Sequence, residues 1–135
     1  MKRRIKVVCG VFWKGLKENP EIGLFKRSEP VQEFEFPGGK IEPGESPKQA
    51  LIRELEEELG VVTKVGVLVG KNTHEYENLI IDIEAYLVNP GPHQFELREH
   101  LEMRWVNESN WKAIKIVEAD LPLIRLAFEK IKKSV

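Results

Sequence analysis

One stretch, residues 38–61, constrains the fold more than any other part of the sequence. A loop rich in glycine and proline leads into a segment with strong helix-start signals. Ser46 is a favourable N-cap residue, and Gln49 completes a capping box with it. Pro47 falls at the first helical position, where its missing N–H costs nothing. The sequence therefore predicts a helix of about 13 residues that ends at Gly60.

Four glutamates fall within five residues near the end of this helix. Side chains three and four positions apart share a helix face, so Glu54, Glu57 and Glu58 point the same way, while Glu56 lies off that face. Crowded carboxylates repel one another unless a cation or water compensates them. The opposite face carries the apolar stripe that we expect to be buried, formed by Leu51, Ile52, Leu55 and Leu59.

This pattern has two explanations, a solvated helix face or a site for a divalent cation. Carboxylates on one face, beside a glycine loop that brings backbone carbonyls close, provide the oxygen ligands that Mg²⁺ and Mn²⁺ prefer. The capping residues, the preceding loop and the fixed spacing favour the cation site. Because Mg²⁺ commonly combines a few carboxylates with substrate phosphates, this site indicates a phosphorylated substrate.

The rest of the chain predicts strands on both sides of this helix and a second helix after them. The predicted strands are residues 4–13, 21–27, 61–76 as one strand or two, 79–88 and 103–106. Residues 34–45 contain too much glycine and proline to be regular, residues 89–92 form a turn, and residues 122–133 have helical spacing. This order predicts a single domain, residues 1–135, of the α/β class, with a mixed sheet packed between helices.

Composition and charge limit the partners of the chain. The formal net charge of -1 disfavours a long nucleic acid, which usually requires a basic excess. No segment approaches the roughly 20 apolar residues of a membrane span. The single Cys9 has no partner for an internal disulfide, and its apolar neighbours predict a buried thiol. We therefore expect a cytoplasmic monomer or weak dimer that acts on a small molecule.

Residues 38–61 also resemble the Nudix box, the signature of the Nudix hydrolase family. That signature is a Gly, five residues, a Glu, seven residues, then Arg-Glu-apolar-any-Glu-Glu-any-Gly-apolar. Every defined position is filled, by Gly39, Glu45, Arg53, Glu54, Leu55, Glu57, Glu58, Gly60 and Val61. The order of elements on both sides is similar to that of the family. The resemblance implies the Nudix α/β/α sandwich, with a central mixed sheet between helices, over essentially the whole chain.

The resemblance also implies roles for the residues of the box. Arg53 and Glu45 would orient the carboxylates and fix the loop. The bound metal, Mg²⁺ or alternatively Mn²⁺, would neutralise substrate phosphates and help to generate hydroxide for attack on phosphorus. The implied metal ligands are the carbonyl of Gly39 and the side chains of Glu54, Glu57 and Glu58.

Three features resemble the MutT-like branch of the family, whose members hydrolyse nucleoside triphosphates to the monophosphate and pyrophosphate. The first is the run FEFPGGKIEPGE, residues 34–45. The second is Glu99, six residues before Trp105, where the branch places an additional catalytic and metal-binding glutamate. The third is Asp120, where the branch places a residue that reads the base. Alternatively, Glu99 is one more charge in a polar loop and Asp120 is the N-cap of the last helix.

Other residues match the family more loosely. Cys9, Phe36 and Ile81 match positions that line the base pocket, although apolar strand residues are usually core residues. Arg27 is placed to contact phosphate or sugar, or it is a surface residue. His100 is predicted to be a bystander, because hard cations prefer oxygen ligands.

The base remains open between two candidates. An ionised Asp120 only accepts hydrogen bonds, which favours an edge with donors, such as N1 and N2 of guanine or N4 of cytosine. We expect 8-oxo-dGTP, with CTP, dCTP or a modified cytosine nucleotide as the alternative. Leu79 stands where some cytidine-type members have Arg, which disfavours that alternative. Two rivals are hydrolysis of RNA 5′ ends, which the net charge disfavours, and a non-catalytic binding module, which would be expected to lose box carboxylates.

Overall fold

A long first strand, β1, organises the sheet. The structure, a computed structural model, describes residues 2–28, 32–89 and 94–134. Its elements in chain order are β1 (Arg3–Leu16), β2 (Asn19–Arg27), β3 (Phe34–Glu35), β4 (Gly38–Lys40), α1 (Pro47–Leu59), β5 (Lys64–Glu75), β6 (Leu79–Asn89), β7 (His100–Val106), the 3₁₀ turns Trp111–Ala113 and Glu118–Asp120, and α2 (Leu121–Ser134).

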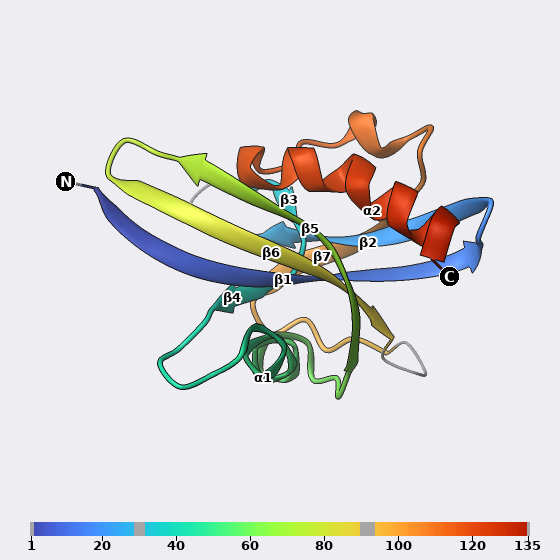
Figure 1. Cartoon of the computed structure of the whole chain (residues 1–135). Coiled ribbons are helices and arrows are strands. Elements are labelled where there is room, and N and C mark those ends of the chain that lie inside the picture. The colour runs from blue at the N-terminus through green and yellow to red at the C-terminus, as the bar shows by residue number, and fades with distance from the viewer. Residues whose placement is uncertain (1, 29–31, 90–93, 135) are drawn as a thin grey trace.

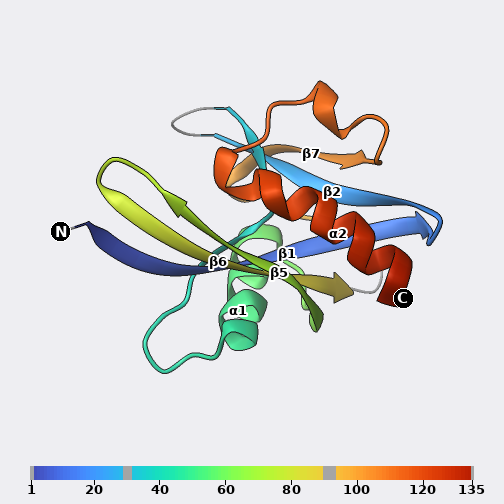
Figure 2. The same cartoon turned by 45° about the horizontal axis from the view of Figure 1, so that its top comes forward.

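Strand β1 belongs to both halves of a mixed sheet. Its residues 3–12 pair with β6 in parallel, and its residues 13–16 pair with β2 in antiparallel orientation. The main order is β3-β2-β1-β6-β5, with β4 paired to β1 and β7 paired to β2. Figure 1 shows α1 on one face of the sheet and α2 on the other, and Figure 2 shows the length of α2 lying across the sheet. This is the predicted α/β/α arrangement.

Alternate residues of β1 face the two helices. Cys9 and Val11 belong to the apolar core on the α2 side, whereas Val8 and Phe12 belong to the core on the α1 side. Successive strand residues point to opposite faces, so one strand supplies both cores. The strand runs longer than the predicted residues 4–13 at both ends, as does β2 at its start.

Both ends of α1 are capped. The Ser46 hydroxyl accepts the Gln49 N–H and the Gln49 side chain accepts the Ser46 N–H, which confirms the predicted capping box. Gly60 ends the helix with a φ of 64°, in the left-handed region that favours glycine. The loop before β7 adds a second cap, because the Arg98 N–H donates to the Glu58 carbonyl at 3.1 Å. This cap holds the loop against the end of α1.

The buried face of α1 differs from the predicted stripe. Ile52 is 37% exposed, whereas Ala50 and Glu58 are buried with Leu51, Leu55 and Leu59. Successive residues of a helix are rotated by about 100° about its axis. Because Leu51 faces the sheet, Ile52 lies at the edge of the buried face of α1. The prediction for Ile52 was wrong, and the carboxylate face opposite the predicted stripe contributes one buried carboxyl group, that of Glu58.

The glycine-rich run 34–45 is more regular than predicted. It contains β3, which pairs with β2, and β4, which pairs with β1. Residues 64–75 form the single strand β5, and the last helix is α2, which begins after a 3₁₀ turn. Of the predicted turn at residues 89–92, residues 90–92 lie outside the described residues.

Candidate active site

The Arg53 guanidinium is the centre of the box. It donates two hydrogen bonds to the Glu45 carboxylate, at 2.7 and 2.9 Å, and one to Glu54 at 2.9 Å. A longer contact of 3.4 Å reaches Glu57, and another N–H donates to the Lys40 carbonyl at 3.1 Å. One cation therefore joins the loop to two carboxylates of α1.

This contact changes the acidity of Glu45. Its hydrogen bond to Arg53, together with the Glu42 N–H, lowers the pKa of Glu45 to about 2. The same pair raises the pKa of Arg53 above its ordinary value. The two-point geometry is the strong form of an arginine–carboxylate pair, and it fixes the loop ahead of α1.

Glu58 lies in a different environment from its neighbours. It is 5% exposed, and its carboxyl group accepts the Gly38 N–H at 3.3 Å. Burial first, then the charges of Glu54, Glu99 and Glu35, raises its pKa to about 9. Burial raises the pKa of Glu54 as well. At neutral pH and without a cation, Glu58 therefore holds a proton.

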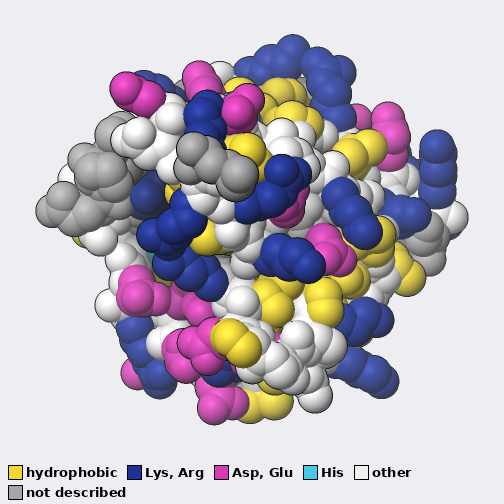
Figure 3. Space-filling model, turned by 60° about the vertical axis from the view of Figure 1, so that its left-hand side comes forward, with side chains coloured by type: hydrophobic (Ala, Val, Ile, Leu, Met, Phe, Trp, Pro, Cys, Tyr) yellow, Lys and Arg dark blue, Asp and Glu magenta, His cyan; other side chains and the backbone are white. Residues whose placement is uncertain are grey.

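The structure places Glu99 beside the box. Glu99 and Glu58 line the same cleft, of about 210 Å³, together with Arg27, Ser28, Glu35 and His100. Glu99 is exposed, in the loop that caps the end of α1. The cap therefore explains how a residue 41 positions along the chain reaches Glu58. On the face seen in Figure 3, acidic side chains gather beside lysine and arginine side chains.

The residues of the box fit a hard divalent cation in the chemistry of their donor atoms. In the part of the chain that the structure describes, no three His, Cys, Asp or Glu side chains converge enough to hold a metal ion. Arg53 holds Glu54 and Glu57, which keeps them from converging on Glu58. The available donors are all oxygens, and a cation would relieve the crowding that keeps Glu58 protonated. A methyl group on Gly39 would meet the Glu54 carboxylate, so this glycine leaves room for it.

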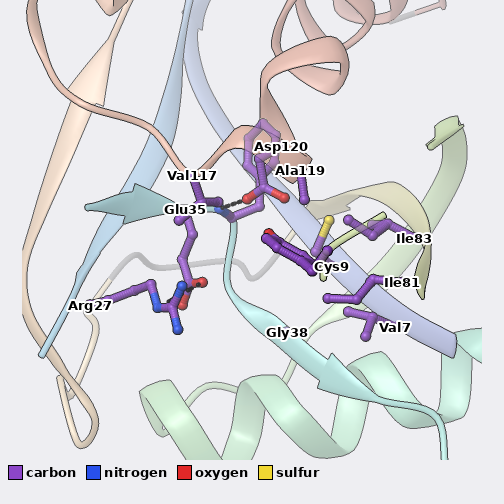
Figure 4. A pocket seen from close by; sticks show the side chains of 12 residues that line it. Val7, Cys9, Arg27, Glu35, Gly38, Ile81, Ile83, Val117, Ala119 and Asp120 are labelled. Carbon is purple, nitrogen blue, oxygen red and sulfur yellow. Dashed lines mark hydrogen bonds and ion pairs between the residues drawn. The ribbon is translucent and has the colours of Figure 1, made fainter. Parts of the chain in front are cut away.

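All five residues predicted to bind substrate line one cavity of about 190 Å³, shown in Figure 4. They come from five separate parts of the chain and meet on the α2 side of β1. The cavity wall also includes residues that the sequence did not single out. The predicted members are Cys9, Arg27, Phe36, Ile81 and Asp120, and the others are Val7, Glu35, Gly38, Tyr76, Ile83, Val117 and Ala119.

Asp120 lies at one end of this cavity and is buried. Its Oδ2 accepts the Phe36 N–H at 2.9 Å, which is a long-range contact and not the cap of α2 that the sequence also allowed. Burial, and then the Glu35 charge, raises the pKa of Asp120 to about 7. Near neutral pH the group is therefore present in both protonation states, and not only in the ionised form that the sequence argument considered. The amide of Asn72 supports this turn by donating to the Ala119 carbonyl at 2.9 Å.

His100 has a partner that the sequence did not indicate. Its side chain is 4% exposed, and its Nε2 lies 2.9 Å from Glu35 Oε2. Glu35 is also 3.7 Å from the Arg27 Nε. Sequence reasoning missed this pair because Glu35 and His100 are 65 positions apart and meet only when β3 and β7 pack against β2.

This geometry agrees with the comparison to known proteins. The NUDIX domain family matches residues 4–126. The chain belongs to the Nudix family. The 8-oxo-dGTP diphosphatase of Haemophilus influenzae is 38% identical over 126 residues, covering 91% of this chain and 90% of that protein. The CTP pyrophosphohydrolase of Escherichia coli K12 is 37% identical over 91 residues, covering 67% of each.

A solved structure is similar over the whole fold. The solution structure of the Escherichia coli ORF135 protein superposes with a TM-score of 0.81 at 30% identity, covering 96% of this chain and 91% of that one. The predicted Nudix fold and the prediction of a Nudix hydrolase are thus confirmed. Nudix hydrolases generally need a divalent metal. No helix within the described ranges has the length and apolar character needed to cross a membrane.

Replacing Glu58 by Gln should stabilise the metal-free Nudix domain. The folded-state pKa of about 9 lies above the ordinary value of 4.5. The contribution of Glu58 to the free energy of unfolding is therefore greatest below pH 4.5 and is lost as the pH rises toward 9. That loss is about 3 kcal/mol at pH 7, and an amide avoids it while it still accepts the Gly38 N–H. Urea unfolding in EDTA should show the Glu58→Gln advantage growing between pH 5 and pH 8.

The matched control is Glu57→Gln, on the same helix and 59% exposed. The difference in free energy of unfolding between Glu57→Gln and the parent protein should change little between pH 5 and pH 8. Equal pH dependence for both variants would show that Glu58 is not held protonated by burial.

Substitutions at Gly39 of the box and at the adjacent Gly38 should separate an effect on activity from an effect on folding. In Gly39→Ala the methyl group meets only the movable end of Glu54, so the fold should survive while activity falls about tenfold or more. In Gly38→Ala the methyl group meets the backbone of Val8, at a φ of 157° that side chains rarely adopt, and stability should fall by about 2 kcal/mol or more. Thermal unfolding and turnover of both variants test this pair, and similar losses of stability would contradict it.

Proposed function

We propose that the chain is a nucleoside triphosphate pyrophosphohydrolase that converts 8-oxo-dGTP to the monophosphate and pyrophosphate. The observation that carries this proposal is the continuity of the site: the cavity that ends at Asp120 adjoins the cleft beside Glu58, and the two share Arg27 and Glu35. A base in the cavity then directs its phosphates toward the box. The similarity to a diphosphatase of this name over 91% of the chain supports the same substrate.

The residues of the chain divide the work of this reaction. Phe36 and the apolar wall enclose the base, and Asp120 binds its polar edge. Arg27 is placed to bind phosphate or sugar where the two spaces meet. Glu54, Glu57, Glu58, Glu99 and the Gly39 carbonyl would hold Mg²⁺, or Mn²⁺, with Arg53 and Glu45 holding the loop and helix in register. When bound, the metal supplies positive charge to the phosphates and lowers the pKa of attacking water.

A cytidine nucleotide is the second candidate. The similarity to a CTP pyrophosphohydrolase over 67% of the chain favours it, and so does the raised pKa of Asp120. A protonated carboxyl group donates one hydrogen bond and accepts others, which suits the N3 acceptor and N4 donor of cytosine. An ionised carboxylate suits the N1 and N2 donors of guanine. Asp120 can therefore serve either base, depending on its protonation.

Substrate ranking and product identity test the proposal. We expect kcat/KM for 8-oxo-dGTP to exceed that for dGTP, CTP and dCTP by about a hundredfold, near 2.7 kcal/mol of transition-state binding, with a monophosphate and pyrophosphate as products. Glu57→Gln and Glu58→Gln should each reduce turnover by orders of magnitude, because both carboxylates would bind the metal. A cytidine preference would select the second candidate, and near-full activity of both variants would refute the box as the catalytic site.

The preference between bases should depend on pH. Because the pKa of Asp120 is about 7, raising the pH from 6 to 8 converts a donor into an acceptor, and the ratio of kcat/KM for guanine over cytosine nucleotides should rise severalfold. The ratio compares two substrates of one enzyme at one pH, so pH effects on the shared phosphate chemistry cancel. Asp120→Asn, which does not titrate, should give a ratio independent of pH. A pH-independent ratio in the parent protein would contradict the role of Asp120.

A further inference from the structure

Two side chains are common to the cavity and the cleft. Arg27 and Glu35 line both the space of about 190 Å³ near Asp120 and the space of about 210 Å³ near Glu58. Each space is smaller than the roughly 300–1,000 Å³ of a site that encloses a whole small molecule. A nucleoside triphosphate whose base lies near Asp120 and whose phosphates reach the box, as the proposed function requires, therefore extends through both spaces. The sugar joins these parts, so it lies beside Arg27 and Glu35.

The position of Glu35 agrees with this division. Figure 4 shows Glu35 and Arg27 together on the side of the cavity nearer α1, away from Asp120. After burial, the charge of Glu35 is among the causes that raise the pKa of Asp120 and of Glu58. Because these effects weaken with distance, Glu35 lies within electrostatic range of both ends of the site.

The chemistry of Glu35 restricts what it can bind. A carboxylate repels phosphate groups and accepts hydrogen bonds, and between the base and the phosphates of a nucleotide the hydrogen-bond donors are the hydroxyl groups of the sugar. Glu35 Oε2 is bound to His100, whereas Oε1 is 3.7 Å from the Arg27 Nε, too long for a strong hydrogen bond. Oε1 therefore retains the capacity to accept a hydrogen bond from a ligand.

His100 holds the carboxylate of Glu35 in one orientation. The imidazole is buried and packs against Phe25, with the ring centroids 5.5 Å apart. Its Nδ1 has no hydrogen-bond partner among the described residues, so the hydrogen bond to Glu35 is the one that orients the ring, with the proton assigned to Nε2. A buried ring fixed by packing restrains its partner more tightly than a surface ion pair does.

We propose that Glu35 is the sugar-binding residue of the site, where it accepts a hydrogen bond from the 3′-hydroxyl group of the nucleotide, and that His100 is the residue that positions it. The 3′-hydroxyl is common to ribonucleotides and deoxyribonucleotides, so the contact serves both candidate substrates. This inference rests on the proposed function, because the division into base, sugar and phosphate spaces assumes a nucleotide.

Matched nucleotides with and without the 3′-hydroxyl test the contact. In the parent protein, kcat/KM should fall about tenfold or more from dGTP to 2′,3′-dideoxy-GTP, mainly through KM. In Glu35→Ala, dGTP hydrolysis should weaken and the two substrates should differ by no more than about twofold. The control is Glu33→Ala, two positions away and paired with Lys115, which should keep the discrimination of the parent.

Two variants of His100 separate positioning from packing. His100→Phe keeps the ring against Phe25 and loses the donor, so discrimination for the 3′-hydroxyl should fall while kcat for dGTP changes little. His100→Gln offers a donor again and should restore part of the discrimination. Equal discrimination in the parent and His100→Phe, with both folded by thermal unfolding, would refute the positioning role.

Further outcomes distinguish this inference from the proposed function. If dGTP is hydrolysed but the dideoxy substrate is equally good, the sugar contact is refuted and the function stands. If Glu35→Ala changes the ratio of dGTP to dITP instead, Glu35 reads the base and the inference is overturned. If no nucleotide is hydrolysed, the function fails, and calorimetric binding of α,β-methylene-dGTP and its 3′-deoxy form decides the sugar contact: equal affinities, or no binding of either, refute it.

Discussion

The Arg53 guanidinium holds the functional half of the molecule together. It bonds to the loop through Glu45 and the Lys40 carbonyl, and to α1 through its own backbone and the carboxylates of Glu54 and Glu57. Without this cation the loop and the helix would present like charges to each other. The same contacts make Arg53 an internal counter-ion for the carboxylates of Glu54 and Glu57.

Glu58 lies beyond the reach of that compensation. Its carboxyl group accepts a hydrogen bond from the Gly38 N–H, and Glu58 is among the buried residues of α1. The negative charges of Glu54, Glu99 and Glu35 act on this carboxyl group and raise its pKa further. The box thus combines two kinds of carboxylate, one group neutralised by an arginine and one kept neutral by a proton. Under the proposed metal role, stability and function conflict at Glu58, since a proton on its carboxyl group favours the fold and removal of that proton is needed to bind a cation.

Local signals in the sequence predicted much of this arrangement, and contacts between distant segments decided the rest. Capping by Ser46 and Gln49 and the spacing of the box depend on neighbours along the chain, so they were readable. The exposure of Ile52, the contact of Asp120 with Phe36 and the pair of Glu35 with His100 depend on how elements pack, which periodicity does not specify. Sequence reasoning therefore identified the box and five residues of the cavity wall, but it did not identify the contacts of Glu35 between them.

Strand β1 contributes to the apolar cores on both faces of the sheet, and this limits where residues can be inserted or deleted. Because Val8 faces α1 and Cys9 faces the cavity that ends at Asp120, removing or adding one residue ahead of them would exchange the two faces. The parallel pairing with β6 would shift at the same time. Substitutions in this strand act on one core each, but an insertion or deletion acts on both cores and on the cavity together. In a family of such sequences, we expect gaps in an alignment to accumulate in the connecting loops and to be absent from β1.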